Sequence, residues 1–224
     1  PEAFRDSQTL RGNIRLQRAL DGGGEIVVTP YFRDTDMTFL QHFLPGQAIE
    51  KNGHTSVGIQ SAWYVDRWIV GLDAENTRGQ LSEFQPNPTV SGSAFLVNTI
   101  PSGAHYDYDV ETLMSGFYGE VNWAFAPNWS LLAGLRAEQH AYDYTTNKAP
   151  GTYGRFRVAP NRTDEFNLMT PKLGVAYNGF EGVELYANYA RGERAPQTSD
   201  QYRLQSLQAI QKLDVETLDS FEIG

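Results

Sequence analysis

The chain has 224 residues, a formal net charge of -9 at pH 7 and a sequence pI near 4.9, and this acidic balance argues against a nucleic-acid partner held by its phosphates. It contains no cysteine, which excludes disulfide bonds and cysteine-ligated metal sites. It also lacks an apolar run of about 18 residues or more, which excludes a transmembrane helix.

Apolar and polar residues alternate in paired segments along the chain. This period of two predicts β-hairpins, because successive side chains of a strand point to opposite faces. The four hairpins turn at residues 21–24, 66–67, 126–128 and 178–182. A ninth segment contains Phe221 and runs to the last residue. The sequence therefore predicts an all-β chain of about nine strands.

Turn length agrees with the face on which the apolar side chains fall. Facing residues of a hairpin must share one face, so a two-residue turn must move the apolar row from odd to even positions, as it does at 66–67. Turns of three and five residues must leave the row on odd positions, as the next two hairpins do. With Phe125 opposite Trp129, this register places Tyr118 opposite Arg136.

Short and long connections alternate, and all short turns fall at one end of the strands. The long connections are predicted at residues 34–55, 78–109, 145–165 and 192–215. Usual hairpin loops have about 2 to 5 residues. Short periplasmic turns and long extracellular loops are typical of outer-membrane barrels. The fold class is therefore part of a large antiparallel up-and-down transmembrane β-barrel, not closed on its own.

Aromatic residues flank the short turns on the apolar face, where an interfacial girdle is expected. Examples are Trp63 with Trp68 and Phe125 with Trp129.

A soluble carbohydrate-binding or hydrolytic β-sandwich also explains the alternation, and it places these aromatic residues in a core. A passive porin-type channel is the other alternative, with the same barrel wall.

The polar face is expected to line a hydrated lumen in such a barrel. The predicted lumen-wall residues are Tyr118, Glu120, Arg136, Glu138 and Glu184. The pair of Tyr118 and Arg136 is interpreted as a wall contact and not as a ligand site.

Signals for catalysis or metal binding are weak. The four histidines lie outside metalloprotease motifs, and no nucleophile elbow or phosphate loop is present, so no catalytic residue and no enzyme activity are predicted. His105, Asp107, Asp109 and Glu111 share one strand face, but ligands at every second residue lie about 7 Å apart. We therefore predict no metal site there and interpret the tract as a solvated loop base.

Two of the long connections carry arginine and aromatic side chains. Arginine binds carboxylates in a bidentate manner and stacks on flat rings, so an anionic catecholate or carboxylate chelate suits these loops, whereas ordinary polar loops with no ligand role are the alternative. The candidate ligand-binding residues are Tyr153, Arg155, Phe156, Arg157, Tyr202 and Arg203.

The last part of the chain carries a set of short motifs. Residues 185–192 read LYANYARG, an Arg-Ala-Pro segment follows, and the chain ends in Ser-Phe-Glu-Ile-Gly. The motif residues are Arg194, Ala195, Pro196, Phe221, Glu222 and Gly224. With TPKLGVAYN at 170–178, these motifs resemble the TonB-dependent outer-membrane receptor family. The resemblance is strong over about 170 to 224 and only general before it.

The resemblance implies a barrel of about 22 strands with a plugged lumen in the outer membrane of a Gram-negative bacterium. It also implies TonB-energised uptake of a scarce nutrient, most often a ferric siderophore, without a resident cofactor. The partners it implies are outer-membrane lipid, an N-terminal plug domain, TonB acting through the missing N-terminal region, and a small-molecule ligand.

Residues 1–224 are expected to be an internal part of such a barrel domain, with the plug domain and the last strands absent. Bacterial barrels have an even number of strands, whereas about nine are predicted here. Pro1 precedes a strand that heads toward a short turn, so it is expected on the extracellular side.

Overall fold

The computed structural model describes residues 3–41 and 45–224, so Pro1 and its predicted position lie outside the described residues. The strands are β1 (Arg5–Asn13), β2 (Leu16–Ala19), β3 (Glu25–Leu40), β4 (Ile49–Val65), β5 (Trp68–Gln85), β6 (Gly103–Ala126), β7 (Trp129–Thr146), β8 (Gly151–Tyr153), β9 (Phe156–Val158), β10 (Arg162–Phe180), β11 (Val183–Arg194), β12 (Leu204–Gln205) and β13 (Glu216–Ile223). The helices are α1 (Ala94–Thr99) and α2 (Thr198–Tyr202). In the described residues, no helix is long and apolar enough to cross a membrane.

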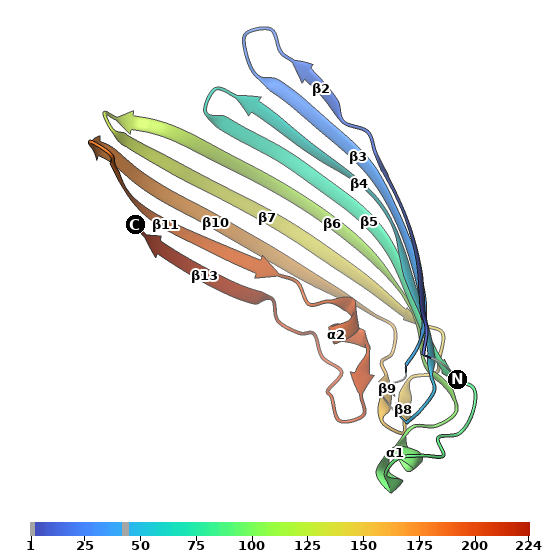
Figure 1. Cartoon of the computed structure of the whole chain (residues 1–224). Coiled ribbons are helices and arrows are strands. Elements are labelled where there is room, and N and C mark those ends of the chain that lie inside the picture. The colour runs from blue at the N-terminus through green and yellow to red at the C-terminus, as the bar shows by residue number, and fades with distance from the viewer. Residues whose placement is uncertain (1–2, 42–44) are drawn as a thin grey trace.

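Most strands belong to one curved antiparallel sheet (Figure 1). Its strand order is β1-β3-β4-β5-β6-β7-β10-β11-β13. β2 continues β1 after a break at residues 14–15, and both pair with β3, so nine strand positions cross the sheet. Within the described chain, β1 and β13 do not pair with each other. The predicted antiparallel sheet of about nine strands, not closed on its own, is confirmed.

The predicted register is confirmed in two hairpins. Val65 pairs with Trp68 across the turn at 66–67. Asp66 has a φ of 50°, the left-handed value that tight hairpin turns require. Tyr118 pairs with Arg136 between β6 and β7. The turn residues thus fix which face each strand presents.

The later two turns are shorter than predicted. The register shifts beside the first of them, so that Ala126 and not Phe125 pairs with Trp129. A similar shift lets Phe180 pair with Val183 across the second. The predicted turn lengths of three and five residues are therefore wrong, because a β-bulge takes up the extra residues and leaves a two-residue turn.

The strands also extend further than predicted at the end with long connections. The limits 34–55 and 78–109 are wrong, since the intervening residues are 41–48 and 86–102. A membrane-spanning strand needs about 9 to 11 residues, whereas β5 has 18 and β6 has 24. The outer parts of β4 and β5 carry polar residues on both faces, at 50–56 and 75–80, which hides the period of two there. In the outer part of β6 the apolar residues move to even positions, and Tyr106 and Tyr108 alternate with Asp107 and Asp109.

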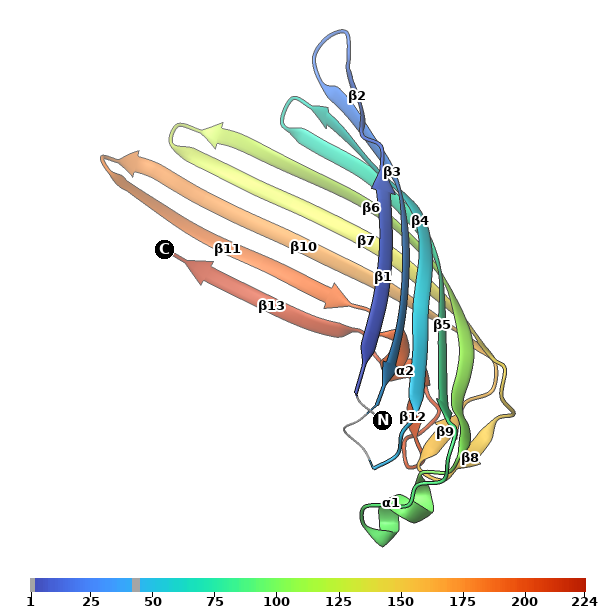
Figure 2. The same ribbon diagram turned by 45° about the vertical axis from the view of Figure 1, so that its right-hand side comes forward.

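The apolar face of the sheet is uncovered. Trp63 and Leu185 are each 46% exposed, and Val121 and Leu131 are half-buried. Figures 1 and 2 show no second large sheet packed on this face. The β-sandwich alternative placed these side chains in a core, so that prediction is wrong.

A smaller layer covers the sheet only at the long-connection end. β12, β9 and β8 form a three-stranded sheet there, next to α2 (Figure 2). The buried apolar core lies between this layer and the outer ends of the long strands, and it includes Tyr106, Tyr144 and Tyr202. The buried apolar core of the described chain therefore lies where the long connections meet.

Candidate functional site

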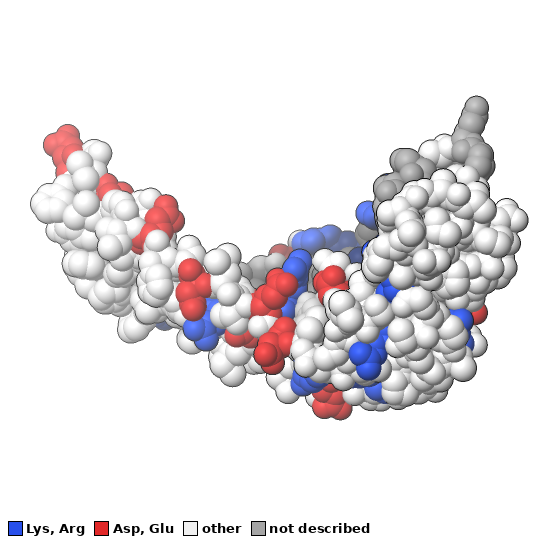
Figure 3. Space-filling view, turned by 90° about the horizontal axis from the view of Figure 1, so that it is seen from below, with Lys and Arg blue, Asp and Glu red and all other residues white. Residues whose placement is uncertain are grey.

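Charged side chains line the face of the sheet on which α2 lies. Arg136 on β7 donates to Asp73 Oδ2 on β5 at 2.6 Å and also contacts Glu138. Lys172 on β10 pairs with Glu120 on β6. Seen from below, the chain forms an open arch in which acidic and basic side chains lie close together (Figure 3). Opposite charges thus neutralise one another along this wall.

The remaining predicted wall residues lie on the same strands. The guanidinium of Arg136 lies 5.5 Å from the centroid of the Tyr118 ring, and the Tyr118 hydroxyl donates to the Ser61 carbonyl at 3.1 Å. Glu184 is exposed near the start of β11. A lumen-wall role for these residues stays a prediction.

Glycines on this face allow long side chains to lie flat on the wall. A Cβ atom at Gly71 would overlap the Tyr118 ring and the Ser61 carbonyl oxygen, and one at Gly134 would lie 2.6 Å from Cε of Lys172. Because a glycine on the neighbouring strand leaves space, the Tyr118 ring lies over Gly71 and the Lys172 side chain lies over Gly134, along the surface of the sheet.

The small sheet brings several predicted ligand-binding residues together. Tyr153 lies on β8, Phe156 and Arg157 lie on β9, and Leu204 on β12 pairs with Arg157. Arg155 stands between β8 and β9, and its Nε donates to Gln205 Oε1 at 3.2 Å. Two distant connections, 147–161 and 195–215, therefore form one unit.

The six candidates differ in exposure. Phe156 is 4% exposed and Tyr202 is 0% exposed, so their side chains hold the unit together from inside. Tyr153, Arg155 and Arg157 are partly exposed. A ligand contact for these partly exposed residues stays a prediction.

Tyr202 at the end of α2 fastens residues 195–215 to the long strands. Its ring stacks on Tyr144 with centroids 4.5 Å apart, and its hydroxyl donates to Asp164 Oδ2 at 2.9 Å. Burial and then the bond to Asp164 raise the pKa of Tyr202, so the hydroxyl stays protonated and remains a donor.

Arg203 provides a second attachment of residues 195–215 to the long strands. The sequence indicated Arg203 as a ligand-binding residue but not its carboxylate partners. Its Nη2 lies 2.7 Å from Glu50 on β4 and 2.5 Å from Glu83 on β5. The side chains of Glu50 and Glu83 are only 4% and 2% exposed. Arg203 therefore compensates two buried carboxylates and is not free to bind an anion.

His105 completes this cluster and corrects the predicted solvated loop base. It is 1% exposed, with Nδ1 2.7 Å from Glu83 Oε1 and Nε2 2.7 Å from the Pro101 carbonyl oxygen. The register between β5 and β6 shifts at Glu83, so a β-bulge turns His105 away from Asp107 and into the interior. In the described residues, no group of three acidic or histidine side chains is placed to hold a metal ion.

The attachment of residues 195–215 through Arg203 and Glu83 is expected to persist in mild acid. Burial raises the pKa of Glu83, but the hydrogen bond from His105 and the charge of Arg203 outweigh burial and hold this pKa below its usual range. The stabilisation is then complete above the unfolded-state pKa of about 4.3, and it is lost as the pH falls through the lower folded-state value. Hydrogen exchange of residues 198–205, corrected for intrinsic rates, should stay constant from pH 8 to about 5 and quicken only below that range.

The control for this pH profile is Glu83→Gln, which removes the titrating carboxylate. The titratable and charged neighbours facing Glu83 are Arg203 on the loop, His105 on β6 and Glu50 on β4. The variant is expected to exchange faster at every pH and to show a flatter profile. A wild-type profile that changes between pH 8 and 6 would contradict the assignment to Glu83.

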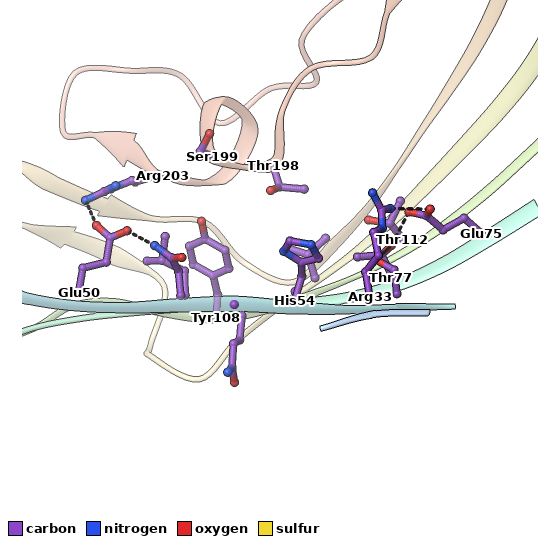
Figure 4. Close-up of a pocket in the computed structure, with 17 residues that line it drawn as sticks. Arg33, Glu50, His54, Glu75, Thr77, Tyr108, Thr112, Thr198, Ser199 and Arg203 are labelled. Atoms are coloured by element: carbon purple, nitrogen blue, oxygen red, sulfur yellow. Dashed lines mark hydrogen bonds and ion pairs between the residues drawn. The ribbon is translucent and has the colours of Figure 1, made fainter. Parts of the chain in front are cut away.

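A polar cavity of about 430 Å³ lies beneath α2 (Figure 4). Thr198 and Ser199 line it from α2, and the opposite wall comes from β3 to β6. His54 and Tyr108 point from that wall toward α2. Thr77 lies ten residues past the turn at 66–67, about 33 Å along the strand. The cavity therefore lies near the outer limit of a membrane-spanning segment.

The Arg-Ala-Pro motif joins β11 to the fastened connection. Arg194 pairs with Glu216 on β13 at 2.7 Å. Ala195 is 9% exposed, and the Pro196 carbonyl accepts a hydrogen bond from Tyr142 at 3.2 Å. The motif thus directs the chain inward from the end of the strand.

The last motif lies on β13. Phe221 packs on Tyr189 with ring centroids 4.9 Å apart, and Glu222 Oε1 accepts from the Tyr186 hydroxyl at 3.0 Å. Gly224 exchanges two backbone hydrogen bonds with Tyr186. These contacts give the motif residues a role in strand pairing.

Comparison with known proteins agrees with this architecture. The family model described as "TonB dependent receptor-like, beta-barrel" matches residues 3–224. The chain matches none of the curated proteins. The solved siderophore receptor PiuA from Acinetobacter baumannii is similar, with a TM-score of 0.74 and 15% identity over 99% of this chain and 38% of that chain.

Two further solved structures are similar at comparable identity. The ferric-catecholate import receptor Fiu from E. coli K12 in its open form has a TM-score of 0.62 and 18% identity, over 87% of this chain and 37% of Fiu. The copper transporter OprC has a TM-score of 0.64 and 15% identity, over 99% of this chain and 36% of OprC. These likenesses show the fold. The chain spans less than two-fifths of the length of each of these structures.

Proposed function

The chain belongs to the TonB-dependent receptor-like β-barrel family, whose members are transporters and not enzymes, and from this premise we propose that it serves energised uptake of a scarce nutrient across an outer membrane. The ligand class that we propose is a ferric siderophore. Solved receptors of similar fold are described as siderophore and ferric-catecholate receptors, which supports this choice.

One observation carries the membrane part of the proposal. A single sheet exposes apolar side chains on one face and charged side chains on the other, and its tight turns all lie at one end. Lipid outside and water or a plug inside satisfy both faces. Residues 1–224 then form an internal part of the barrel domain. A plug domain, further strands and a TonB-binding segment belong to the rest of the receptor.

The uptake test uses the full-length receptor in iron-starved Gram-negative cells. Radiolabelled iron, supplied as a ferric trihydroxamate or a ferric tris-catecholate, is expected to enter only when both the receptor and TonB are present. Iron entry that is independent of TonB would indicate a passive channel. No uptake of any ferric complex would reject the proposed ligand class.

Leu72→Arg tests which face meets lipid. Leu72 is 59% exposed on the apolar face, a few residues from the turn at 66–67. A charged side chain near the membrane midplane of a barrel costs about 2 to 4 kcal/mol. The full-length variant is expected to lose this free energy of unfolding in lipid vesicles, as measured by denaturant titration.

The matched control is Gln60→Arg, at an exposed position on the opposite face of the neighbouring strand. The added charge meets water there, so the change in unfolding free energy is expected to stay below about 1 kcal/mol. Equal losses in both variants would contradict the assignment of the two faces.

A further inference from the structure

The cavity beneath α2 combines hydroxyl groups with a balanced set of charges. Its charged walls contain two arginines and two glutamates, namely Arg33, Arg203, Glu50 and Glu75. Both arginines are already paired in short contacts, Arg33 with Glu75 at 2.6 Å and Arg203 with Glu50 at 2.7 Å. The cavity therefore offers an anion no uncompensated positive charge.

An anionic ligand would also meet a like charge on both sides of the cavity. An anionic ligand that approached either guanidinium would lie beside the carboxylate already paired with it, Glu75 or Glu50, and that carboxylate would repel it. Glu50 is also held by Gln41 at 2.7 Å, so it cannot turn away from such a ligand without losing that hydrogen bond. In the sequence, Arg203 suggested an anionic ligand. In the structure, its pairing with Glu50 disfavours one.

Uncharged polar groups face the same space. The hydroxyl groups of Tyr108, Thr112, Thr198 and Ser199 line the cavity, and in the described residues none of them forms a side-chain hydrogen bond with another protein group. Figure 4 shows His54 and Tyr108 on the wall opposite Thr198 and Ser199. The four hydroxyl groups donate and accept hydrogen bonds and carry no charge. A volume of about 430 Å³ is enough for a small ligand.

We infer that this cavity selects an uncharged ligand rich in carbonyl and hydroxyl oxygens, and that charge neutralisation of Arg33 and Arg203 is the basis of this selectivity. The inference rests on the proposed uptake function and narrows its ligand class. A ferric trihydroxamate complex without net charge and a neutral oligosaccharide share this chemistry, whereas a ferric tris-catecholate does not.

The binding test uses the full-length receptor in detergent and three probes: a neutral ferric trihydroxamate, a neutral oligosaccharide and a ferric tris-catecholate. Titration calorimetry is expected to give tighter binding for one of the neutral probes than for the tris-catecholate. Tyr108→Phe and Thr198→Val each remove one hydroxyl and keep the shape. Each is expected to weaken the neutral probe about 2- to 10-fold, the effect of one hydrogen bond.

The matched control is Thr145→Val, which removes an exposed hydroxyl from β7 outside the cavity and is expected to leave binding unchanged. Glu75→Gln removes the charge that compensates Arg33, and it is expected to strengthen tris-catecholate binding about 10-fold. If Glu75 had only a structural role, Glu75→Gln would not strengthen binding of the tris-catecholate.

The outcomes separate this inference from the proposed function. Tighter wild-type binding of the tris-catecholate, or unchanged neutral binding in both hydroxyl variants, would overturn the inference and leave iron uptake in place. Binding of the oligosaccharide, but of neither ferric complex, would support the inference and reject the ferric ligand class.

Discussion

Arg203→Ala is expected to detach residues 195–215 from the long strands while the large sheet stays folded. The substitution leaves Glu50 and Glu83 buried without their common cation. Loss of one partner from a buried ion pair costs about 3 to 5 kcal/mol, and we expect the lower end because 29% of the Arg203 side chain is exposed. Hydrogen exchange in the full-length receptor should show faster exchange of residues 198–205 by about 100-fold.

The matched control for Arg203→Ala is Arg78→Ala. Arg78 also pairs with a glutamate, Glu111 at 3.6 Å, but its side chain is 77% exposed. Exposed ion pairs contribute little to stability, so exchange in residues 198–205 should not change. If both variants behave alike, the buried cluster does not fasten the loop.

Gly71→Val is expected to impair folding of the barrel wall itself. The new side chain would overlap the Tyr118 ring and the Ser61 carbonyl oxygen. The ring can move, but the carbonyl belongs to the neighbouring strand and cannot move without disturbing the sheet. Overpacking of this kind costs about 1 to 3 kcal/mol or more, which should appear as a lower yield of folded receptor and a lower midpoint of denaturant unfolding.

Gly119→Val is the control for this substitution, because Gly119 lies in the same region of the sheet on the other face. A Cβ atom added at Gly119 would lie 4.0 Å from the Ile69 carbonyl oxygen, which is an ordinary van der Waals contact. We expect this variant to fold as the wild type does. Equal damage from both valines would show that strand flexibility, and not close approach of Tyr118, is what Gly71 provides.

The alternation of residues alone predicted the sheet, the order of its hairpins and the pairing of Tyr118 with Arg136. These features are local, since the parity of a strand and the length of a turn decide which side chains share a face. One predicted loop limit failed where both faces of a strand are polar, as at residues 75–80 of β5. Another limit failed in β6, where Tyr106 and Tyr108 face a protein core and not lipid, so that the apolar residues lie on the other face of the strand.

The candidate site was predicted less completely for a different reason. Tyr202 and Arg203 were found by residue type, but their partners Asp164, Glu50 and Glu83 lie in three other strands. Nothing in the spacing of these residues indicates that they meet. Sequence therefore identified arginines that suit an anion, and only the structure showed that buried carboxylates neutralise Arg203.

By itself, the sequence determined that this protein is a ribbon of hairpins with one apolar and one polar face, because strand geometry converts a period of two directly into two surfaces. Only the tertiary structure decided that the connection 195–215 folds back over the polar face, that a bulge turns His105 inward, and that a neutral cavity results. The physical reason is that charge compensation and burial depend on distances between strands remote in sequence, and those distances are set by packing.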